Sequence, residues 1–440
     1  MMFIYSDSLD FVDPHYDFLR DESPEGRRPY WDDAFPHEIL HEAPYDGILV
    51  SRSIVGDHRL KGKYSDSQAM RFRRVGARRF LRFDGPEHKA KPLFGDCGAF
   101  SYSKLDEPPY GAADTVEYYG DAGFTHGCSV DHVIFEFEPD PLGMSGGSAN
   151  ARHRFEITLE NAAEFKRESR ALGPSFTPLG VIQGWSPNSM AEAARRLESM
   201  GYDYLAVGGL VPLDVEAIAR AVTAIRSALR ARTRLHLLGV AKADDIARIA
   251  SLGIASTDTT SPLLRAFKDT RSNYYALQED GSITYYTAIR VPQALENLRL
   301  TRLVKSGRLG QEELVLLEAA ALDALRAYDE DALSLEETFA PVMAYATKLF
   351  EGDSETARRK QLVFYGDAYR RMLADKPWKR CGCRICRECG IEVAIFRSTN
   401  RNKRRGIHNL WVFNRRLKRL TGELALGAET DIHCDRCAAE

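Results

Sequence analysis

Residues 178–209 decide the fold, because two short apolar runs enclose one helical pattern in this stretch. The runs are PLGVIQG (178–184) and YLAVGG (204–209), and MAEAARRLESMG (190–201) lies between them. Neither run alternates strictly between apolar and polar residues, as expected of strands that are buried on both faces of a parallel sheet. The helical pattern ends at Gly201, and glycine suits the C-terminal end of a helix. The stretch therefore predicts two buried strands joined by a helix.

Similar apolar runs recur from residue 47 to about residue 265. Eight candidate strands result: GILVSRSIV (47–55), RRFLRF (78–83), PLFGD (92–96), HVIFEF (132–137), PLGVIQG, YLAVGG, LHLLGV (235–240) and ASTDTTS (255–261). Helical patterns separate the later runs, for example FEITLENAAEF (155–165) and the stripe from Val215 to Leu229. Eight strands with intervening helices fit an α/β fold of the (β/α)8 TIM-barrel type better than a doubly wound sheet.

The pattern changes after the barrel. The segment QEDGSITYYT (278–287) reads as a β-hairpin, and residues 311–376 are nearly all helix-forming. Four cysteines, a basic loop and a final amphipathic helix HNLWVFNRRLKRL (408–420) follow. The predicted domains are a TIM-barrel domain at 1–300, a helical insertion at 301–376 and a cysteine-containing subdomain with its closing helix at 377–440.

Composition excludes several classes of protein. Of the 440 residues, 44% are hydrophobic and 28% are charged, as in an ordinary soluble globular protein. The N-terminus has acids and a proline where a secretory signal needs a basic start and an apolar run. No membrane span is predicted, since no apolar run approaches the length that one requires. Without an export signal we expect a cytoplasmic protein with reduced thiols.

Three basic runs stand out although the net charge is only −3. They are RFRRVGARRFLRF (71–83), RSTNRNKRRG (397–406) and NRRLKRL (414–420). Such runs can simply be solvated faces. Interleaved aromatic residues in the first, and the nearby cysteines in the second, favour contacts with the phosphates of a nucleic acid.

The segment CGCRICRECG (381–390) predicts a metal site. Three thiolates and an imidazole can close a tetrahedral structural Zn²⁺ site, and the proposed ligands are Cys381, Cys383, Cys386 and His408. Disulfides are disfavoured, because crowded cysteines in a reducing compartment favour metal. Cys389 is a competing ligand. Further residues that could form a second site or replace one ligand are His433, Cys434 and Cys437.

Polar residues follow the candidate strands where a barrel places its active site. These residues are Asp96, Gln183 with Gly184, Gly208 with Gly209, and Asp258. Asp131 is a further candidate and the exception, because it precedes its apolar run. A single aspartate after a strand is usually a helix N-cap, but three acids with a glutamine and a glycine pair at one rim indicate chemistry. Two carboxylates could break a glycosidic bond with retention of configuration. The Gln183 amide and the backbone of the glycine pair could read the edge of a flat heterocycle, which could approach the main chain closely.

Several motifs together resemble the tRNA-guanine transglycosylase superfamily. In chain order they are GDCGAFSY (95–102), LGVIQG (179–184), YLAVGGL (204–210), GIASTDTTSP (253–262) and the zinc motif CGCRIC (381–386) with HNL (408–410). The sequence departs from the first family motif at Cys97, Ala99 and Ser101, and the Asp-Glu-Cys base-recognition signature is absent.

The resemblance implies a base-exchange enzyme. Asp258 would be the nucleophile at C1′ and Asp96 the general acid and base. The residues that would bind the base are Asp131, Gln183, Gly184, Gly208, Gly209 and Leu210. The enzyme would expel guanine from a nucleotide that has left its stack, hold the sugar on Asp258 and accept a 7-deazaguanine such as 7-cyano-7-deazaguanine.

The helical segment at 311–376 and the N-terminus YSDSLDFVDPHYDF (5–18) resemble the DpdA branch of the superfamily, whose members place 7-deazaguanines in DNA. DNA is therefore favoured over tRNA as the substrate. The alternatives are a tRNA-guanine transglycosylase of the queuosine or archaeosine type, a noncatalytic zinc-bearing nucleic-acid-binding subunit, and a barrel glycosidase acting on sugars. The presence of Asp258 disfavours the noncatalytic subunit. The scarcity of tryptophan at the rim disfavours the glycosidase. The sequence leaves open a helper ATPase and a homodimer.

Overall fold

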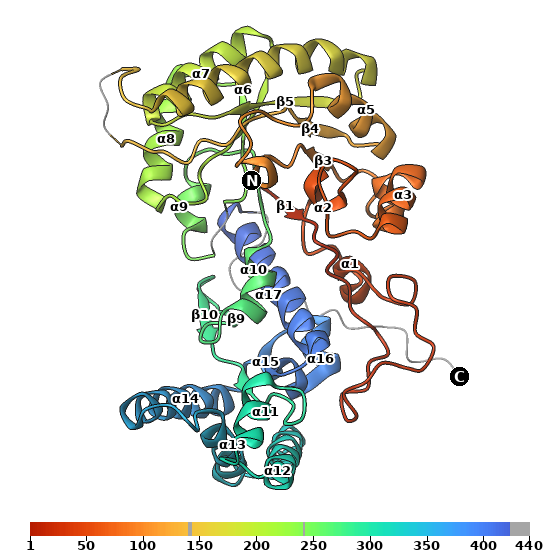
Figure 1. Ribbon diagram of the computed structural model, residues 1–440, viewed down its shortest axis with the longest axis vertical. Helices are drawn as coiled ribbons and strands as arrows, with labels where there is room; N and C mark the ends of the chain where they lie inside the picture. Colours follow the sequence, from red (N-terminus) through yellow and green to blue (C-terminus); the bar gives the residue numbers. More distant parts are fainter. Residues whose placement is uncertain (140–142, 241–242, 423–440) are drawn as a thin grey trace. The chain divides into compact units, whose positions relative to one another are not determined.

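The computed structural model describes residues 1–139, 143–240 and 243–422 and divides into two units (Figure 1). The first unit consists of residues 1–10 and 43–261, and the second of residues 11–42 and the chain from residue 262 onward. This division groups the chain differently from the domain ranges expected from the sequence, because residues 11–42 lie in the second unit.

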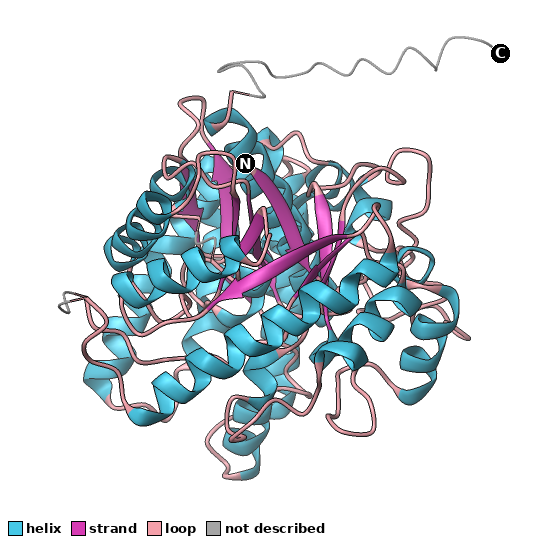
Figure 2. Cartoon of the chain, turned by 90° about the horizontal axis from the view of Figure 1, so that it is seen from above, coloured by secondary structure: helices cyan, strands magenta, loops and turns pink. Residues whose placement is uncertain are grey.

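The first unit is a closed barrel of eight parallel strands, and strands are drawn as magenta arrows in Figure 2. Neighbours in the barrel are also neighbours in the chain, and β1 closes it by pairing with both β2 and β8. The strands are β1 (Met2–Ser6), β2 (Gly47–Ser51), β3 (Leu93–Asp96), β4 (His126–Cys128), β5 (Thr177–Ile182), β6 (Tyr204–Val207), β7 (Arg234–Leu237) and β8 (Ser256–Thr259). The predicted (β/α)8 class is confirmed.

The helices of the first unit follow the strands. They are α2 (Arg52–Val55), α3 (Asp66–Val75), α4 (Ala77–Phe80), α5 (Ala112–Ala122), α6 (Ala149–Glu168), α7 (Pro187–Ser199), α8 (Val215–Ala228) and α9 (Ile246–Ala250). Short 3-10 turns are η1 (Ala99–Tyr102) and η2 (Ser169–Leu172). Asp214 caps α8 by accepting a hydrogen bond from the Ala217 N–H, which satisfies a donor that would otherwise lack a partner. The helical patterns predicted near residues 155, 190 and 215 are α6, α7 and α8.

Apolar side chains of the strands fill the barrel. A fully buried cluster contains Ile4, Leu49, Phe94, Cys128, Leu179, Val181, Tyr204 and Ala206. Gly95 and Gly127 pair across β3 and β4, and an added Cβ on either would come within 2.5 Å of the Tyr119 ring. The two glycines therefore let α5 pack closely on the barrel wall.

Two of the eight predicted strands are wrong. Residues 78–83 form the end of α4 and a turn, since Phe80 and Phe83 lie three residues apart and both point into the core, as a helical turn allows and a strand does not. Residues 132–137 follow the three-residue strand β4 and have no regular structure. Two observed strands, β1 and β4, were not predicted.

The second unit is mainly helical. Its helices are α1 (Pro36–Leu40), α10 (Ser261–Lys268, whose first residue belongs to the first unit), α11 (Leu298–Lys305), α12 (Gln311–Asp329), α13 (Leu335–Leu349), α14 (Glu355–Asp375), α15 (Pro377–Arg380), α16 (Arg384–Cys389) and α17 (Thr399–Leu420), with the 3-10 turn η3 (Gly390–Ala394). Helices α12, α13 and α14 occupy the segment predicted to be helical, and Ser334 caps α13 through a capping box with Glu337.

Short sheets complete the second unit. The predicted hairpin is present, with β9 (Tyr274–Leu277) antiparallel to β10 (Ile283–Tyr286), and β11 (Ile289–Arg290) pairs in parallel with β12 (Ile395–Phe396). The predicted basic loop at 397–406 is instead the first half of α17 from Thr399 onward. Gly406 allows α17 to approach α10, since a Cβ there would meet the Leu263 carbonyl oxygen at 2.8 Å. No helix among the described residues combines the length and the apolar character needed to cross a bilayer.

Candidate active site and metal centre

Asp258 lies on β8 inside the barrel and is only 5% exposed. Its Oδ1 accepts a hydrogen bond from the Gly239 N–H at 2.8 Å and lies 3.2 Å from Nε2 of His236. Its Oδ2 accepts a hydrogen bond from the Ser6 hydroxyl. The carboxylate is thus held in one orientation by groups from β1, β7 and the turn after β7.

Asp96 ends β3, beside Ser51 at the end of β2. Its Oδ2 accepts a hydrogen bond from the Gly98 N–H at 3.0 Å. Burial, and to a smaller extent the negative charge of Asp258, raise the pKa of Asp96 above that of an ordinary aspartate. The structure therefore brings the two predicted catalytic carboxyls within electrostatic reach, and the upward shift of the pKa widens the pH range in which Asp96 is protonated.

Asp131 follows β4, which explains why it precedes the apolar run 132–137 and does not end it. Its carboxylate accepts hydrogen bonds from the Cys97 thiol at 3.1 Å and from the Gln183 amide at 2.6 Å. Tyr102 donates to the Asp131 carbonyl oxygen at 2.9 Å. Burial raises the pKa of Asp131 to about 7. Asp131, Cys97 and Gln183 therefore form one buried polar cluster, and Gln183 also accepts from the Ile134 N–H at 3.2 Å.

The glycines of the predicted base site surround this cluster. An added Cβ on Gly208 would lie 2.3 Å from the Gln183 amide nitrogen, and Gly209 has a φ of +72° beside the same amide. The space next to this glycine pair is therefore taken by Gln183. Gly184 packs against the start of α7, where a Cβ would meet the Ser189 hydroxyl oxygen at 2.7 Å. Leu210 is fully buried.

Three residues of this rim were missed from the sequence. Ser6 and Asp7 lie at the end of the unpredicted strand β1, and His236 lies within the predicted run LHLLGV. Asp7 accepts a hydrogen bond from the Tyr64 hydroxyl at 2.8 Å, and burial raises its pKa to about 6. The apolar run MFIYS at residues 2–6 was the signal that could have placed Ser6 and Asp7.

The four predicted metal ligands come together in the second unit. The sulfur atoms of Cys381, Cys383 and Cys386 and Nδ1 of His408 all lie within 4.8 Å of one another. Nδ1 of His408 lies 3.6, 3.3 and 3.3 Å from the three sulfurs in that order. A tetrahedral zinc ion separates nitrogen and sulfur ligand atoms by about 3.6 Å, so the geometry fits.

The surroundings of His408 set its tautomer. Its Nε2 lies 2.7 Å from the Tyr275 carbonyl oxygen, so that Nε2–H donates and Nδ1 presents a lone pair toward the sulfurs. The ring also stacks on Tyr274 with centroids 4.3 Å apart. An imidazole held in this way suits a metal ligand.

Cys389 does not belong to this group of four. Its sulfur lies 3.6 Å from a guanidinium nitrogen of Arg404. The other candidate ligands, His433, Cys434 and Cys437, lie outside the described residues. The described cysteines are all free thiols, so no disulfide competes with the metal site among them.

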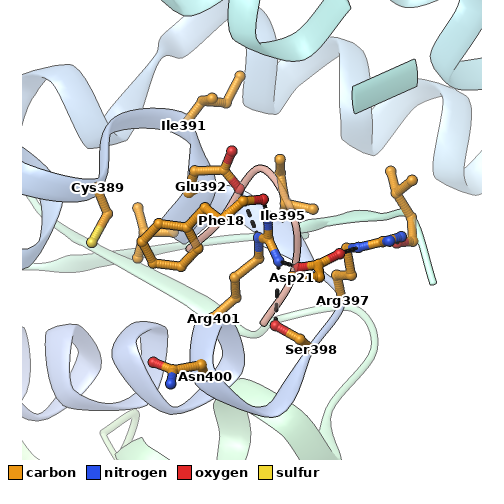
Figure 3. A network of polar contacts seen from close by, with 12 residues as sticks. Phe18, Asp21, Cys389, Ile391, Glu392, Ile395, Arg397, Ser398, Asn400 and Arg401 are labelled. Atoms are coloured by element: carbon orange, nitrogen blue, oxygen red, sulfur yellow. Dashed lines mark hydrogen bonds and ion pairs between the residues drawn. The ribbon is translucent and has the colours of Figure 1, made fainter. Parts of the chain in front are cut away.

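The basic run 397–406 was expected to contact phosphates, and the structure contradicts this expectation (Figure 3). Arg401 is fully buried and donates to Asp21, to Glu392 and to the Phe18 carbonyl oxygen. Arg397 donates to Asp21, Glu318 and the Val291 carbonyl oxygen. The guanidinium groups therefore bind residues of the second unit, and burial lowers the pKa of Arg401 to about 10.

Two further arginines of the run are buried as well. Arg405 donates to the carbonyl oxygens of Val393, Ile395 and Ala266, and Arg404 donates to that of Asp13. This stretch holds the fold together and is not a nucleic-acid surface. The run 414–420 is only partly exposed.

The first basic run has the opposite character. Its aromatic residues Phe72, Phe80 and Phe83 are buried, whereas Arg74 and Arg79 are exposed. A surface hollow of about 650 Å³ is lined by Ser67, Met70, Arg71, Arg74, Val75 and Arg79. The face formed by α3 and α4 thus presents cations to solvent.

The amino-acid sequence is similar to those of known proteins. A protein of Salmonella montevideo named DNA-guanine transglycosylase is 40% identical over 420 residues, which are 95% of this chain and 97% of that protein. The chain belongs to the guanine transglycosylase family. Guanine transglycosylases are pentosyltransferases, so the chain is an enzyme of this class.

Other members of the superfamily match over shorter stretches. The family described as queuine tRNA-ribosyltransferase matches residues 136–284, which include Gln183, the glycine pair and Asp258. A tRNA-guanine(15) transglycosylase of Pyrococcus abyssi (strain GE5 / Orsay) is 27% identical over 237 residues, which are 52% of this chain and 36% of that protein.

Proposed function

We propose that this guanine transglycosylase replaces guanine in DNA by a 7-deazaguanine, such as 7-cyano-7-deazaguanine, through a covalent glycosyl intermediate on Asp258. The observation that carries the choice of DNA is the 40% identity, over 95% of the chain, to a protein named for DNA-guanine exchange. The match to the tRNA-guanine(15) enzyme covers 52% of the chain at 27% identity. A tRNA substrate is the alternative that the experiment below separates.

The chemistry proceeds in two displacements. An oxygen of Asp258 attacks C1′, the bond from C1′ to N9 breaks, and its electron pair leaves with the guanine. Asp96 in its acid form gives the departing base a proton. The incoming 7-deazaguanine then loses its N9 proton to the Asp96 carboxylate, and N9 attacks C1′ and frees Asp258. The raised pKa of Asp96 supports this role, because the group must be protonated when guanine leaves.

The buried cluster of Asp131, Cys97 and Gln183 would bind the base. A carboxylate at this depth can accept N–H groups from the edge of guanine, and the donors Cys97 and Gln183 hold it in place. The target nucleotide must leave its stack to reach the rim, because C1′ and the base edge are hidden in a duplex. Gly184, Gly208, Gly209 and Leu210 would shape the floor of this site through the packing described above.

Cys381, Cys383, Cys386 and His408 would hold a structural Zn²⁺ ion. With four protein ligands no position is left for a substrate, so the metal would contribute to folding. Phosphates of the DNA would meet the face of α3 and α4, where Arg74 and Arg79 are exposed.

The proposal is tested by label exchange with the purified full chain. Radioactive guanine is offered with duplex DNA or with tRNA, and label is expected in DNA. Incorporation into tRNA alone would contradict the choice of substrate. No incorporation into either polynucleotide would contradict the proposed base exchange.

The nucleophile is tested by trapping. The chain is mixed with DNA, denatured and examined for a covalent protein–DNA adduct, whose attachment point is found by peptide mass spectrometry. Asp258→Ala is expected to form no adduct and to exchange no guanine while it melts near the wild-type temperature, because the group lies at the rim and not in the apolar core. Exchange at the wild-type rate by this variant, or an adduct elsewhere in the chain, would contradict the assignment.

A further inference from the structure

We infer that His236 is a positioning residue for the nucleophile, and that Asp258 attacks C1′ through Oδ2 while Oδ1 becomes the carbonyl oxygen of the intermediate. The inference rests on the proposed function, because it assigns a role in the step that Asp258 performs. It goes beyond that function by distinguishing the two carboxylate oxygens.

The ring of His236 is fixed inside the barrel. The residue lies on β7, is fully buried, and stacks on Phe94 with ring centroids 5.2 Å apart and planes 25° apart. Its backbone pairs with Ala206 of β6 and Ser256 of β8. A ring clamped on a strand of a closed barrel has little freedom to turn, so the direction of its two nitrogens is set by the fold.

A chain of polar groups sets the tautomer of His236. Nδ1 lies 2.6 Å from the Ser256 hydroxyl oxygen, which lies 2.5 Å from the Tyr204 hydroxyl oxygen. On the other side Nε2 lies 3.2 Å from Oδ1 of Asp258. Were Nδ1 to carry the proton, the lone pair of Nε2 would face a carboxylate oxygen, which is repulsive. Tyr204 therefore donates to Ser256, Ser256 donates to Nδ1, and Nε2–H donates to Asp258.

This assignment makes the two oxygens of Asp258 unequal. Oδ1 accepts two hydrogen bonds, from Gly239 N–H and from His236, whereas Oδ2 accepts one, from Ser6. Donors withdraw electron density from the oxygen that they bind, so Oδ2 retains the freer lone pair for attack. When the bond from Oδ2 to C1′ forms and the bond from C1′ to N9 breaks, Oδ1 becomes a carbonyl oxygen that two fixed donors already hold.

The same two donors serve the second displacement. Breaking the bond from C1′ to Oδ2 returns negative charge to the carboxylate, and hydrogen bonds to a charged oxygen are stronger than those to a neutral one. His236 and Gly239 would thus stabilise Asp258 as a leaving group. A donor placed in advance costs little reorganisation at the moment of reaction.

Three substitutions test the role of His236. His236→Gln can place an amide N–H near the position of Nε2, His236→Asn keeps a polar group beside Ser256 but does not reach Asp258, and His236→Leu keeps bulk without any donor. We expect the rates of guanine exchange and of adduct formation to fall roughly 10- to 100-fold in the Asn and Leu variants. The KM for guanine should stay unchanged, and His236→Gln should regain most of the rate.

His126→Leu is the matched control. His126 also stacks on Phe94, with centroids 4.4 Å apart, and its Nδ1 lies 2.9 Å from the Thr125 hydroxyl oxygen. Its removal should therefore cost a similar amount of packing and leave the rate of exchange unchanged. This control separates the loss of a donor to Asp258 from a general loosening of the barrel.

The outcomes divide clearly. Wild-type rates in His236→Leu, or equal loss in the Gln and Asn variants with melting temperatures lowered as in His126→Leu, would overturn the inference and leave His236 a packing residue. A wild-type chain that forms no adduct would instead overturn the proposed function, and the inference with it. Normal exchange by the wild type with slow Asn and Leu variants and a fast Gln variant supports both.

Discussion

Asp131 connects the chemistry of one buried carboxyl group to the pH of the solution. Its pKa is raised from 3.8 to about 7, chiefly by burial. Folding therefore takes up a proton at this group between these two values. The contribution of Asp131 to stability is fully present below pH 3.8 and is lost as the pH rises through about 7.

This shift predicts how the affinity for guanine depends on pH. Below about pH 7 the neutral acid predominates, and a neutral acid has lost an acceptor for the N–H groups of the base. We expect the KM for guanine to rise by up to about tenfold per pH unit below 7. Measuring KM by label exchange over about pH 6 to 8 tests this. Asp131→Asn should show a high KM with little pH dependence, whereas a flat wild-type profile would contradict the role of Asp131.

The sequence alone predicted the positions of those site residues that lie at the ends of strands. Asp96 and Asp258 could be placed at one rim because parallel strands of a barrel end on the same side. The cluster of Asp131, Cys97 and Gln183 could not be foreseen, since its hydrogen bonds join three different strand ends. His236 was overlooked because a histidine within an apolar run reads as a buried core residue until its neighbour Asp258 on the adjacent strand is known.

At the scale of elements, the cluster of Cys381, Cys383, Cys386 and His408 joins the turn after α15, helix α16 and helix α17. Cys383→Ser is expected to lose about one equivalent of zinc per chain and to lower the free energy of unfolding by at least ~3 kcal/mol, because a structural metal contributes its binding energy to folding. Elemental analysis and thermal denaturation measure both quantities.

Cys389→Ser is the control for this four-residue cluster. Cys389 lies in α16, as Cys386 does, but is not one of the four proposed ligands, so its variant should keep the metal. Loss of zinc in this control, or a metal-free Cys383→Ser protein of wild-type stability, would contradict the ligand set.

The face of α3 and α4 predicts a contact with phosphates. Arg74→Glu and Arg79→Glu should each weaken binding of duplex DNA and reduce the slope of log K against log salt by about one. Fluorescence anisotropy at several salt concentrations measures this slope. The control is Arg220→Glu, which makes the same change of charge at an exposed position of α8. An equal loss of DNA binding in Arg220→Glu would show that the effect comes from the net charge of the protein and not from the face of α3 and α4.

Helices and strands were predicted correctly where an apolar periodicity extends over several turns. They were predicted poorly where contacts with distant residues determine the local structure. Helices α6, α7 and α8 carry an apolar stripe over several turns and were recognised. Strand β4 has three residues, and its glycine is required by the Tyr119 ring, which is not visible in the local sequence. The run RRFLRF has the composition of a strand but the spacing of a helical turn.

At the scale of the whole molecule, residues 11–42 are bound to the rest of the second unit by buried ion pairs. Arg401→Met would leave Asp21 and Glu392 buried with fewer partners, so we expect a loss of about 3–5 kcal/mol in the free energy of unfolding. Chemical denaturation measures it. Arg302→Met, at an exposed position of α11, should change stability by no more than about 0.5 kcal/mol. Equal effects of the two variants would contradict the structural role of the buried network.

Each of the two units is built from two separate segments of the chain. Met2 of β1 pairs with Ser256 of β8, and Asp21 pairs with Arg401, so each unit joins an early segment of the chain to a much later one. Neither unit can be excised as one continuous fragment. Deleting the first forty residues to obtain a minimal catalytic core would remove strand β1 from the barrel. It would also remove Asp21, the anionic partner of Arg401, so neither unit would fold.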